Sequence, residues 1–208
     1  APLDAARGIL RDGGWRFNET ASVWEKKNGS ETISLAFSIA TANTPIFEHT
    51  AEILKSRFAE LGVPVTIRQF EQSDLIQRVI RPRKYEALLF GTIVGRELDF
   101  YSFWHSSERN DPGLNVALYT SLTTDALLST MRKDASADKR KTLYQKFSDE
   151  IKKDVPAIFL YVPSYTYVTA PSVQNVSLAG IAEGSERFEG VSDWYIEKDS
   201  VWPFWNKK

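Results

Sequence analysis

A strand, a helix and a second strand follow one another between residues 31 and 70, and this order limits the fold more than any other feature of the chain. Residues 31–39 alternate apolar and polar side chains, as a half-buried strand does. Apolar residues then recur at helical spacing from Phe47 to Leu61, just before Gly62. Residues 63–70 return to a period of two. A connection of this length joins parallel strands, so the sequence predicts a βαβ unit and an α/β fold.

Three more segments carry patterns of secondary structure. A short helix is predicted over residues 73–80, and it should end there because Pro82 disfavours helical backbone at the residue before it. Residues 85–94 are almost all apolar, which predicts a strand covered on both faces. Residues 156–162 predict one more strand, and the aromatic stretch beyond them has no clear period.

Two helices are predicted between these last two strands, separated by the polar residues 133–140. The first helix carries, at helical spacing, Asp125, Leu128, Met131 and Arg132. The inner face of the second helix should carry Leu143, Phe147 and Ile151. The predicted architecture is therefore a mixed sheet flanked by helices.

Charge and residue usage exclude several classes of function. The chain has 26 basic and 27 acidic residues, so it has no electrostatic reason to bind nucleic acid. It has no cysteine and two histidines, His49 and His105, which are too few ligands to predict a metal site. No nucleophile elbow, phosphate-binding loop or dinucleotide-binding motif is present. We therefore expect no cofactor, no metal and no enzymatic activity, and no apolar run is long enough to predict a membrane span.

The stretch "DFYSFWHSSERNDPGLNVALY", residues 99–119, has no helical or strand period although it is rich in aromatic side chains. It follows a predicted buried strand, and ligands bind at the carboxyl ends of strands in open α/β sheets. Aromatic, amide, hydroxyl and imidazole groups suit a moderately polar organic ligand such as a peptide or a sugar. The same aromatics would also suit the core of an ordered loop. The residues alone leave both interpretations open.

Four motifs in this chain resemble, in order, those of the extracellular solute-binding proteins that serve peptide and nickel ABC transporters, known as solute-binding protein family 5. They are "AARGILRDGGW" (residues 5–15), "DFYSFWHSS" (99–107), "GLNVALYTSLTTDALL" (113–128) and "KRKTLYQKFSDEIKKDVPAIFLY" (139–161). Members of that family are far longer than this chain and have two lobes that close on the solute. The resemblance implies that residues 1–208 are a single α/β domain, the C-terminal lobe of a periplasmic-binding-protein-like (type II) fold.

The resemblance also implies a function and a location. The chain would bind a peptide or a similar small polar solute in a cleft between two lobes, and its partners would be the permease subunits of an ABC importer. It would act at the periplasmic or extracellular face of the cytoplasmic membrane. A signal peptide and a lipoprotein anchor would lie outside this chain, and association with the membrane would occur only through that anchor. A sugar, an opine or a nickel chelate is an alternative solute.

The resemblance implies candidate ligand-binding residues at and beside the positions that match the family. They are Thr92, Glu97, Asp99, Tyr101, Trp104, His105, Asn115 and Tyr119. An acid near this place holds the amino terminus of the ligand in peptide binders of the family, and Asp99 is the nearest match, with Glu97 next. Thr92 is a departure, because the family has Trp after the glycine that corresponds to Gly91.

The same resemblance predicts how the loop is built. We expect Phe100 and Phe103 to turn inward, because phenylalanine gains most from full burial. Tyr101, Trp104 or His105 should then line a concave face. Asp99 should lie near that face without an Arg or Lys that neutralises it.

Two alternatives come from other classes of protein. One is a hydrolase that uses His105 and a carboxylate. The other is a sensory module that reuses this lobe to report a ligand to a membrane partner.

Overall fold

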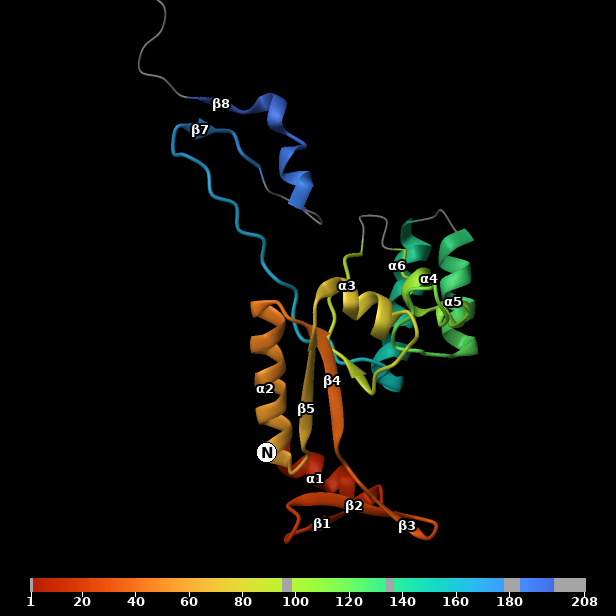
Figure 1. The fold of residues 1–208 in the computed structure, drawn as a ribbon. Helices are drawn as coiled ribbons and strands as arrows, with labels where there is room; N and C mark the ends of the chain where they lie inside the picture. The colour runs from red at the N-terminus through yellow and green to blue at the C-terminus, as the bar shows by residue number, and fades with distance from the viewer. Residues whose placement is uncertain (1, 95–98, 134–136, 178–183, 197–208) are drawn as a thin grey trace, which may run out of the picture. The chain divides into compact units, whose positions relative to one another are not determined.

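The computed structural model describes residues 2–94, 99–133, 137–177 and 184–196. They form two compact units (Figure 1). The first unit comprises Ala1–Gly91 and Ser106–Tyr119, and the second comprises Thr92–His105 and Thr120–Lys208. The prediction that residues 1–208 form a single domain is not tested by this division and stays a prediction.

The first unit is built on the βαβ unit that the sequence predicts. Strands β4 (Phe37–Ala42) and β5 (Val65–Phe70) pair in parallel, with α2 (Pro45–Leu61) between them in the chain. Figure 1 shows α2 lying along these two strands. The helix ends at Gly62, which has a left-handed φ of 84°, and Val63 N–H closes the cap on Phe58 O at 2.9 Å. The α/β fold class is therefore confirmed.

Each face of this parallel sheet has its own apolar core. One face packs against α2, and its buried residues are Ile39, Ala51, Val65 and Leu89. The other packs against a helical stretch, α3 (Gln72–Asp74) continued by the π-helix η1 (Leu75–Ile80), and its buried residues are Ala40, Ala42, Leu75, Val79 and Ile80. The helix predicted over residues 73–80 is thus confirmed, and it stops before Pro82.

The strand predicted over residues 31–39 is wrong as a single element. It breaks at Leu35 and Ala36 into β3 (Glu31–Ser34) and β4, which belong to different sheets. Strand β3 pairs antiparallel with β2 (Val23–Asn28), and β2 pairs with β1 (Arg16–Asn18). At the break, Leu35 N–H still bonds Trp24 O beside β2 at 2.7 Å, Ala36 N–H turns back to Ser34 O at 3.0 Å, and Phe37 N–H bonds Pro64 O beside β5 at 3.2 Å. Helix α1 (Pro2–Asp12) precedes this antiparallel sheet.

Two other strand predictions also fail in part or in full. Of residues 85–94, only β6 (Ala87–Leu88) pairs with β4, and Leu89 N–H adds a bond to Ala40 O at 2.9 Å. Phe90 and Ile93 are 44% and 66% exposed, so the residues beyond Leu89 are not covered on two faces. No strand forms over residues 156–162. An apolar run gives the composition of a buried strand but does not supply the neighbour to which the strand must pair.

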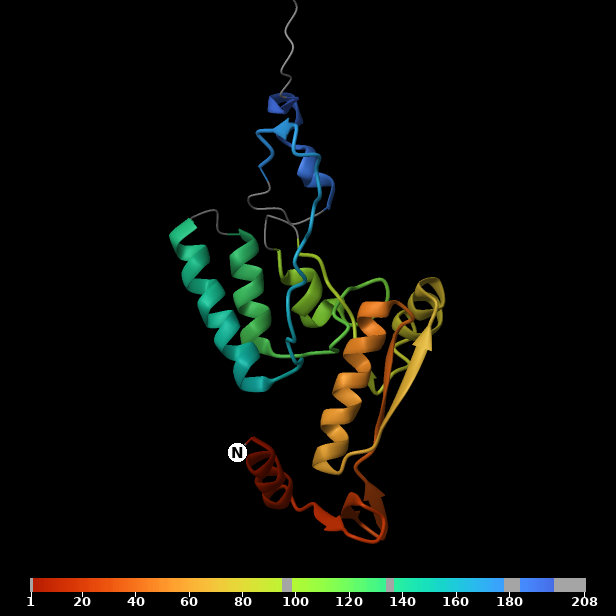
Figure 2. The ribbon, with the colours of Figure 1, turned by 90° about the vertical axis from the view of Figure 1, so that its left-hand side faces the viewer.

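The second unit contains the two helices that the sequence predicts. They are α5 (Leu122–Lys133) and α6 (Ala137–Asp154), and they pack against each other. Buried at their interface are Leu128, Met131, Phe147 and Ile151. Leu143, which should be buried too, is only half-buried. Figure 2 shows the two helices side by side.

Short elements complete both units. Loop 106–119 of the first unit begins with the 3₁₀ turn η2 (Ser106–Glu108). Arg83 holds this loop, since its guanidinium donates to Arg109 O at 2.8 Å and to Gly113 O at 2.6 Å. In the second unit, strands β7 (Val173–Gln174) and β8 (Tyr195–Ile196) pair antiparallel, and the 3₁₀ turns η3 (Gly184–Phe188) and η4 (Val191–Asp193) lie between them in the chain.

Candidate functional site

Residues 99–105 form a compact loop around one helical turn, α4 (Tyr101–Trp104), which packs against α5. Phe100 lies against α6, with its ring centroid 5.6 Å from that of Phe147 and 5.4 Å from that of Tyr144. The prediction that Phe100 anchors the loop is therefore confirmed. Phe103 is half-buried.

Trp104 also packs within the second unit. Its ring centroid lies 6.4 Å from that of Phe147 and 5.9 Å from that of Phe159. The indole is half-buried, so it combines an anchoring contact with a partly exposed surface. Its proposed contact with a ligand stays a prediction.

Tyr101 lies in contact with two nitrogen-bearing side chains. The imidazole of His105 stacks on its ring, with 4.0 Å between centroids and 18° between planes. The guanidinium carbon of Arg132, on α5, lies 4.0 Å from the centroid of the same ring. Such contacts restrict all three side chains, and the cation–π pair adds about 0.5–1 kcal/mol at a partly exposed place. The three groups fix one side of the loop to α5.

Asp99 is paired with the same arginine. Its Oδ2 accepts from Arg132 Nη2 at 2.6 Å and from Arg132 Nε at 3.2 Å, while its Oδ1 accepts from Tyr101 N–H at 3.1 Å. The expectation that Asp99 lies without a neutralising Arg or Lys is therefore wrong. A ligand ammonium at Asp99 would have to compete with the guanidinium. Glu97, the second candidate anchor, lies outside the described residues.

His105 lies near two polar side chains of α5. Its Nδ1 is 4.0 Å from Asp125 Oδ1, and its Nε2 is 3.5 Å from Ser129 Oγ. A nucleophile and its base normally approach within about 2.6–3.2 Å, so neither distance is that of an assembled catalytic pair. This geometry gives the hydrolase alternative no support.

Asn115 and Tyr119 lie in the first unit, whereas the other described candidates lie in the second. Asn115 is completely buried and Tyr119 is 8% exposed. Asn115 Nδ2 donates to Tyr119 O at 2.9 Å, and Tyr119 N–H donates back to Asn115 Oδ1 at 3.1 Å. Both residues therefore close the end of loop 106–119. Thr92 is exposed in the second unit.

The structure thus brings together Asp99, Tyr101 and His105, and it adds two side chains that the sequence had not assigned to the site. They are Arg132 and Asp125, which stand seven residues apart on α5. That spacing, two helical turns, is a signal that could have placed both on one face toward the loop.

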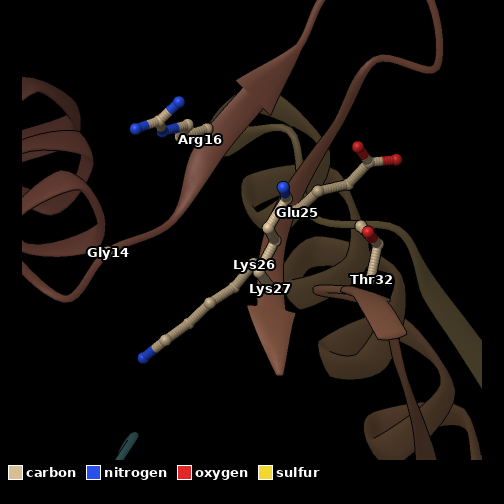
Figure 3. Close-up of a pocket in the computed structure, with 6 residues that line it drawn as sticks. All are labelled: Gly14, Arg16, Glu25, Lys26, Lys27 and Thr32. Atoms are coloured by element: carbon tan, nitrogen blue, oxygen red, sulfur yellow. The ribbon is translucent and has the colours of Figure 1, made fainter. Parts of the chain in front are cut away.

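The first unit has a surface cavity of about 400 Å³ beside its antiparallel sheet. Figure 3 shows its lining residues, which are Gly14, Arg16, Glu25, Lys26, Lys27 and Thr32. Lys26 Nζ donates to Gly13 O at 2.8 Å, and Glu25 Oε2 accepts from Asn18 Nδ2 at 3.1 Å. Three cations against one carboxylate make this cavity positive. No sequence motif had indicated it.

The described residues contain no cluster of three or more His, Cys, Asp or Glu side chains that could hold a metal ion. No helix in the described part of the chain combines the length and the apolar character that a membrane span needs.

Comparison with known proteins gives a clear result for the fold. No protein-family model and no curated protein matches the sequence. The solved structure of the oligopeptide-binding protein AppA from Bacillus subtilis, in complex with a nonapeptide, matches 94% of this chain with a TM-score of 0.74 at 20% identity. NikZ from Campylobacter jejuni, in complex with Ni(L-His), matches 92% of this chain with a TM-score of 0.70 at 21% identity.

A third match, the oligopeptide-binding protein from Thermus thermophilus with a pentapeptide, covers 74% of this chain with a TM-score of 0.67 at 16% identity. The chain is much shorter than these proteins, since it spans 37% of the AppA chain, 38% of the NikZ chain and 28% of the Thermus chain. The resemblance seen in the sequence is thereby confirmed at the level of the fold. This chain has the fold of one part of these oligopeptide-binding proteins and of NikZ.

Proposed function

We propose that this chain is the C-terminal lobe of a solute-binding protein of an ABC importer. The observation that carries the proposal is the structural match over 94% and 92% of the chain to an oligopeptide-binding protein and to NikZ. Both solved structures hold a small solute, a nonapeptide in one and Ni(L-His) in the other. The solute of this protein would be a peptide or a similar small polar molecule.

The loop of residues 99–105 supports this proposal chemically. Tyr101, Trp104 and His105 are partly exposed and combine apolar area with polar groups, which suits a moderately polar ligand. Because Asp99 is neutralised by Arg132, we assign it the role of fixing the loop and not of holding an ammonium group. Thr92, which is exposed, completes the proposed ligand-contacting set in the second unit.

The remaining parts of the proposal follow from this role. The protein would bind its solute without transforming it, as its structural neighbours are binding proteins. Permease subunits would be its partners, and the periplasmic or extracellular face of the cytoplasmic membrane its location. The neighbouring genes distinguish the sensory alternative from an importer. A sensory module should be encoded next to a sensor gene, whereas an importer component should be encoded next to permease genes.

Native mass spectrometry of the full-length protein, purified without added ligand, tests the proposal. We expect a bound solute whose mass identifies it, and calorimetry with the nonapeptide or Ni(L-His) then measures affinity for the two known classes. Turnover of the bound molecule during incubation would contradict the proposal, and so would failure to bind any peptide or metal chelate.

A further inference from the structure

The turn between β2 and β3 exposes an asparagine that is followed by a glycine. Strand β2 ends at Asn28, β3 begins at Glu31, and these two residues face each other across the hairpin. The turn itself consists of Gly29, whose φ is 65°, and Ser30. The whole tip, residues 28–31, is exposed. Asparagine is one of the thermolabile residue types, so an exposed Asn–Gly pair is a place where the chain can change chemically.

The backbone nitrogen of Gly29 is open to approach. A β-carbon placed on Gly29 would have no heavy atom within 4 Å apart from its neighbours in the chain. Glycine also has no side chain of its own to crowd an approaching group. Within the described residues, Gly29 N–H donates no backbone hydrogen bond. The side-chain amide carbon of Asn28 can therefore reach this nitrogen without displacing another group.

The side chain of Asn28 is not held in place either. Four other asparagines use their side-chain amides in hydrogen bonds, and they are Asn18, Asn43, Asn115 and Asn175. The amides of Asn28 and Asn110 make no such bond with the described part of the chain. Asn110 precedes Asp111, whose side chain crowds the next nitrogen. Among the described asparagines, Asn28 thus combines an unbonded amide with a following glycine.

The strand sets the barrier to a reaction between the two groups. Side chains of extended backbone point out of the sheet, so Asn28 must leave the extended conformation before its amide carbon meets the Gly29 nitrogen. This motion requires only that the last pair of the hairpin, Asn28 with Glu31, opens. Strand β3 lies at the edge of its sheet and its four residues are all exposed. Few contacts therefore oppose fraying at this end.

We propose that Asn28 is a site of spontaneous deamidation. The Gly29 nitrogen attacks Cγ of Asn28 and forms a cyclic imide, and the side-chain nitrogen leaves with the displaced proton as ammonia. A solvent water then adds to either carbonyl of the imide and opens the ring. One product is aspartate. The other is isoaspartate, in which the backbone continues through the side-chain carbon of residue 28.

Both products weaken the tip of the hairpin. Each places a carboxylate at position 28, whose cross-strand partner is Glu31, and like charges opposite each other destabilise a sheet. Isoaspartate also adds one carbon to the backbone of β2, so the pairing of residue 28 with Glu31 is lost. The modification is therefore expected to loosen the edge strand β3 first.

Incubation of the full-length protein at mildly alkaline pH tests the inference, because base promotes attack by the Gly29 nitrogen. Proteolytic digestion and mass spectrometry follow each asparagine, and Asn18 and Asn43 are the internal controls. We expect Asn28 to be converted at least about tenfold faster than either control, with isoaspartate and aspartate both present. Equal rates at the three asparagines overturn the inference. Aspartate as the sole product also overturns it, because direct hydrolysis of the side chain gives aspartate alone.

The same measurement in guanidinium chloride tests the role of fraying. We expect the rate at Asn28 in the folded protein to lie within about tenfold of the rate in the unfolded chain, because only the hairpin end must open. A greater slowing overturns the inference. Asn115, which is completely buried and bonded to Tyr119, should be slowed by far more.

Asn28→Gln is the matched variant. It should abolish the conversion at position 28, because glutamine must close a larger ring, and it should leave the rates at Asn18 and Asn43 unchanged. Persisting isoaspartate in the peptide that contains residue 28 would place the reaction at another residue and overturn the assignment. The inference rests on the hairpin and not on the proposed function, so solute binding by the full-length protein is scored separately.

Discussion

Gly62 shows how a single residue limits this fold. Its φ is 84°, and a Cβ there would lie 2.4 Å from Cε2 of Phe17. Gly29 has a comparable φ of 65° but open space around it. Comparing the two positions separates the cost of left-handed backbone from the cost of overpacking.

We expect Gly29→Ala to lower the free energy of unfolding by about 1–2 kcal/mol, because a β-carbon disfavours left-handed backbone. Gly62→Ala should lower it by about 1–3 kcal/mol more, because Phe17 must also move. Urea denaturation of both variants measures the difference. Equal losses of unfolding free energy in the two variants would show that the Phe17 ring moves aside at no energetic cost.

The Asp99–Arg132 pair makes a second prediction at this scale. The two side chains are 44% and 47% exposed, so solvent screens their attraction. A double-mutant cycle with Asp99→Asn and Arg132→Gln should give a coupling free energy of about 0.2–1 kcal/mol. The coupling should fall further at about 1 M salt, as measured by urea denaturation. A coupling that does not respond to salt would mean that stacking on Tyr101, and not charge, holds the pair.

Glu86 provides a pH-dependent contact. Its carboxylate accepts from Ser38 N–H at 2.8 Å and from Ser38 Oγ–H at 2.6 Å, and these bonds lower its pKa from the ordinary 4.5. A lowered pKa stabilises the fold above the unfolded-state pKa, and this stability is lost as the pH falls through the folded-state pKa.

The unfolding free energy of the wild type minus that of Glu86→Gln should therefore be constant at neutral pH and should decrease below the ordinary pKa of 4.5. Thermal melts across this range measure it. Ser38→Ala is the control, because it removes the hydroxyl but keeps the N–H donor and should reduce the decrease without abolishing it. A difference that stays flat with pH would show that Ser38 does not bond the carboxylate in solution.

At the scale of elements, helix α6 contacts the loop of residues 99–105 through the aromatic rings of Tyr144 and Phe147. Phe147 is 5% exposed and stacks on Phe100. Phe147→Ala should lower the free energy of unfolding by about 3–5 kcal/mol, as is usual for a buried phenylalanine. Tyr144→Ala, on the same helix but 43% exposed, should cost much less. Denaturant melts compare the two, and a loss below about 1 kcal/mol for Phe147→Ala would place the residue outside the core.

Helices were predicted from the sequence far better than strands. A helix makes its backbone hydrogen bonds within one segment, and the apolar repeat of that same segment predicts it. Helices α2, α5 and α6 could therefore be predicted from their own residues. A strand needs a neighbour that its sequence does not specify. The alternation of residues 31–39 therefore continues through the break at Leu35 without a sign of it, and the apolar run from Ile158 forms no strand.

The candidate site was predictable only in part, for a related reason. The aromatic content of residues 99–105 identified the loop, and the preference of phenylalanine for burial predicted the role of Phe100. The partner of Asp99 lies 33 residues away, and a local pattern cannot report such a contact. Motif matching also grouped Asn115 with the ligand loop; its amide binds the backbone of Tyr119, and its contact with a ligand stays a prediction.

At the scale of the whole molecule, the prediction concerns affinity. A lobe that supplies part of a cleft loses most of the contacts that hold a solute, while the entropic cost of association stays. We expect the 208-residue chain to fold and yet to bind a nonapeptide or Ni(L-His) at least about 100-fold more weakly than the full-length protein does. Calorimetry on both proteins measures the ratio. Micromolar or tighter binding by the short chain would contradict the two-lobe interpretation.

The path of the chain between its two units has a consequence for how the protein can be divided. The chain leaves the first unit after Gly91, returns at Ser106 and leaves again after Tyr119. Because of this interleaving, no single break in the backbone releases either unit intact. A cleavage after Gly91 would leave loop 106–119 on the downstream fragment, still bound to the upstream one through Arg83 and through Tyr85, whose hydroxyl donates to Val116 O at 2.6 Å. Neither unit can therefore be produced from one unbroken stretch of the gene.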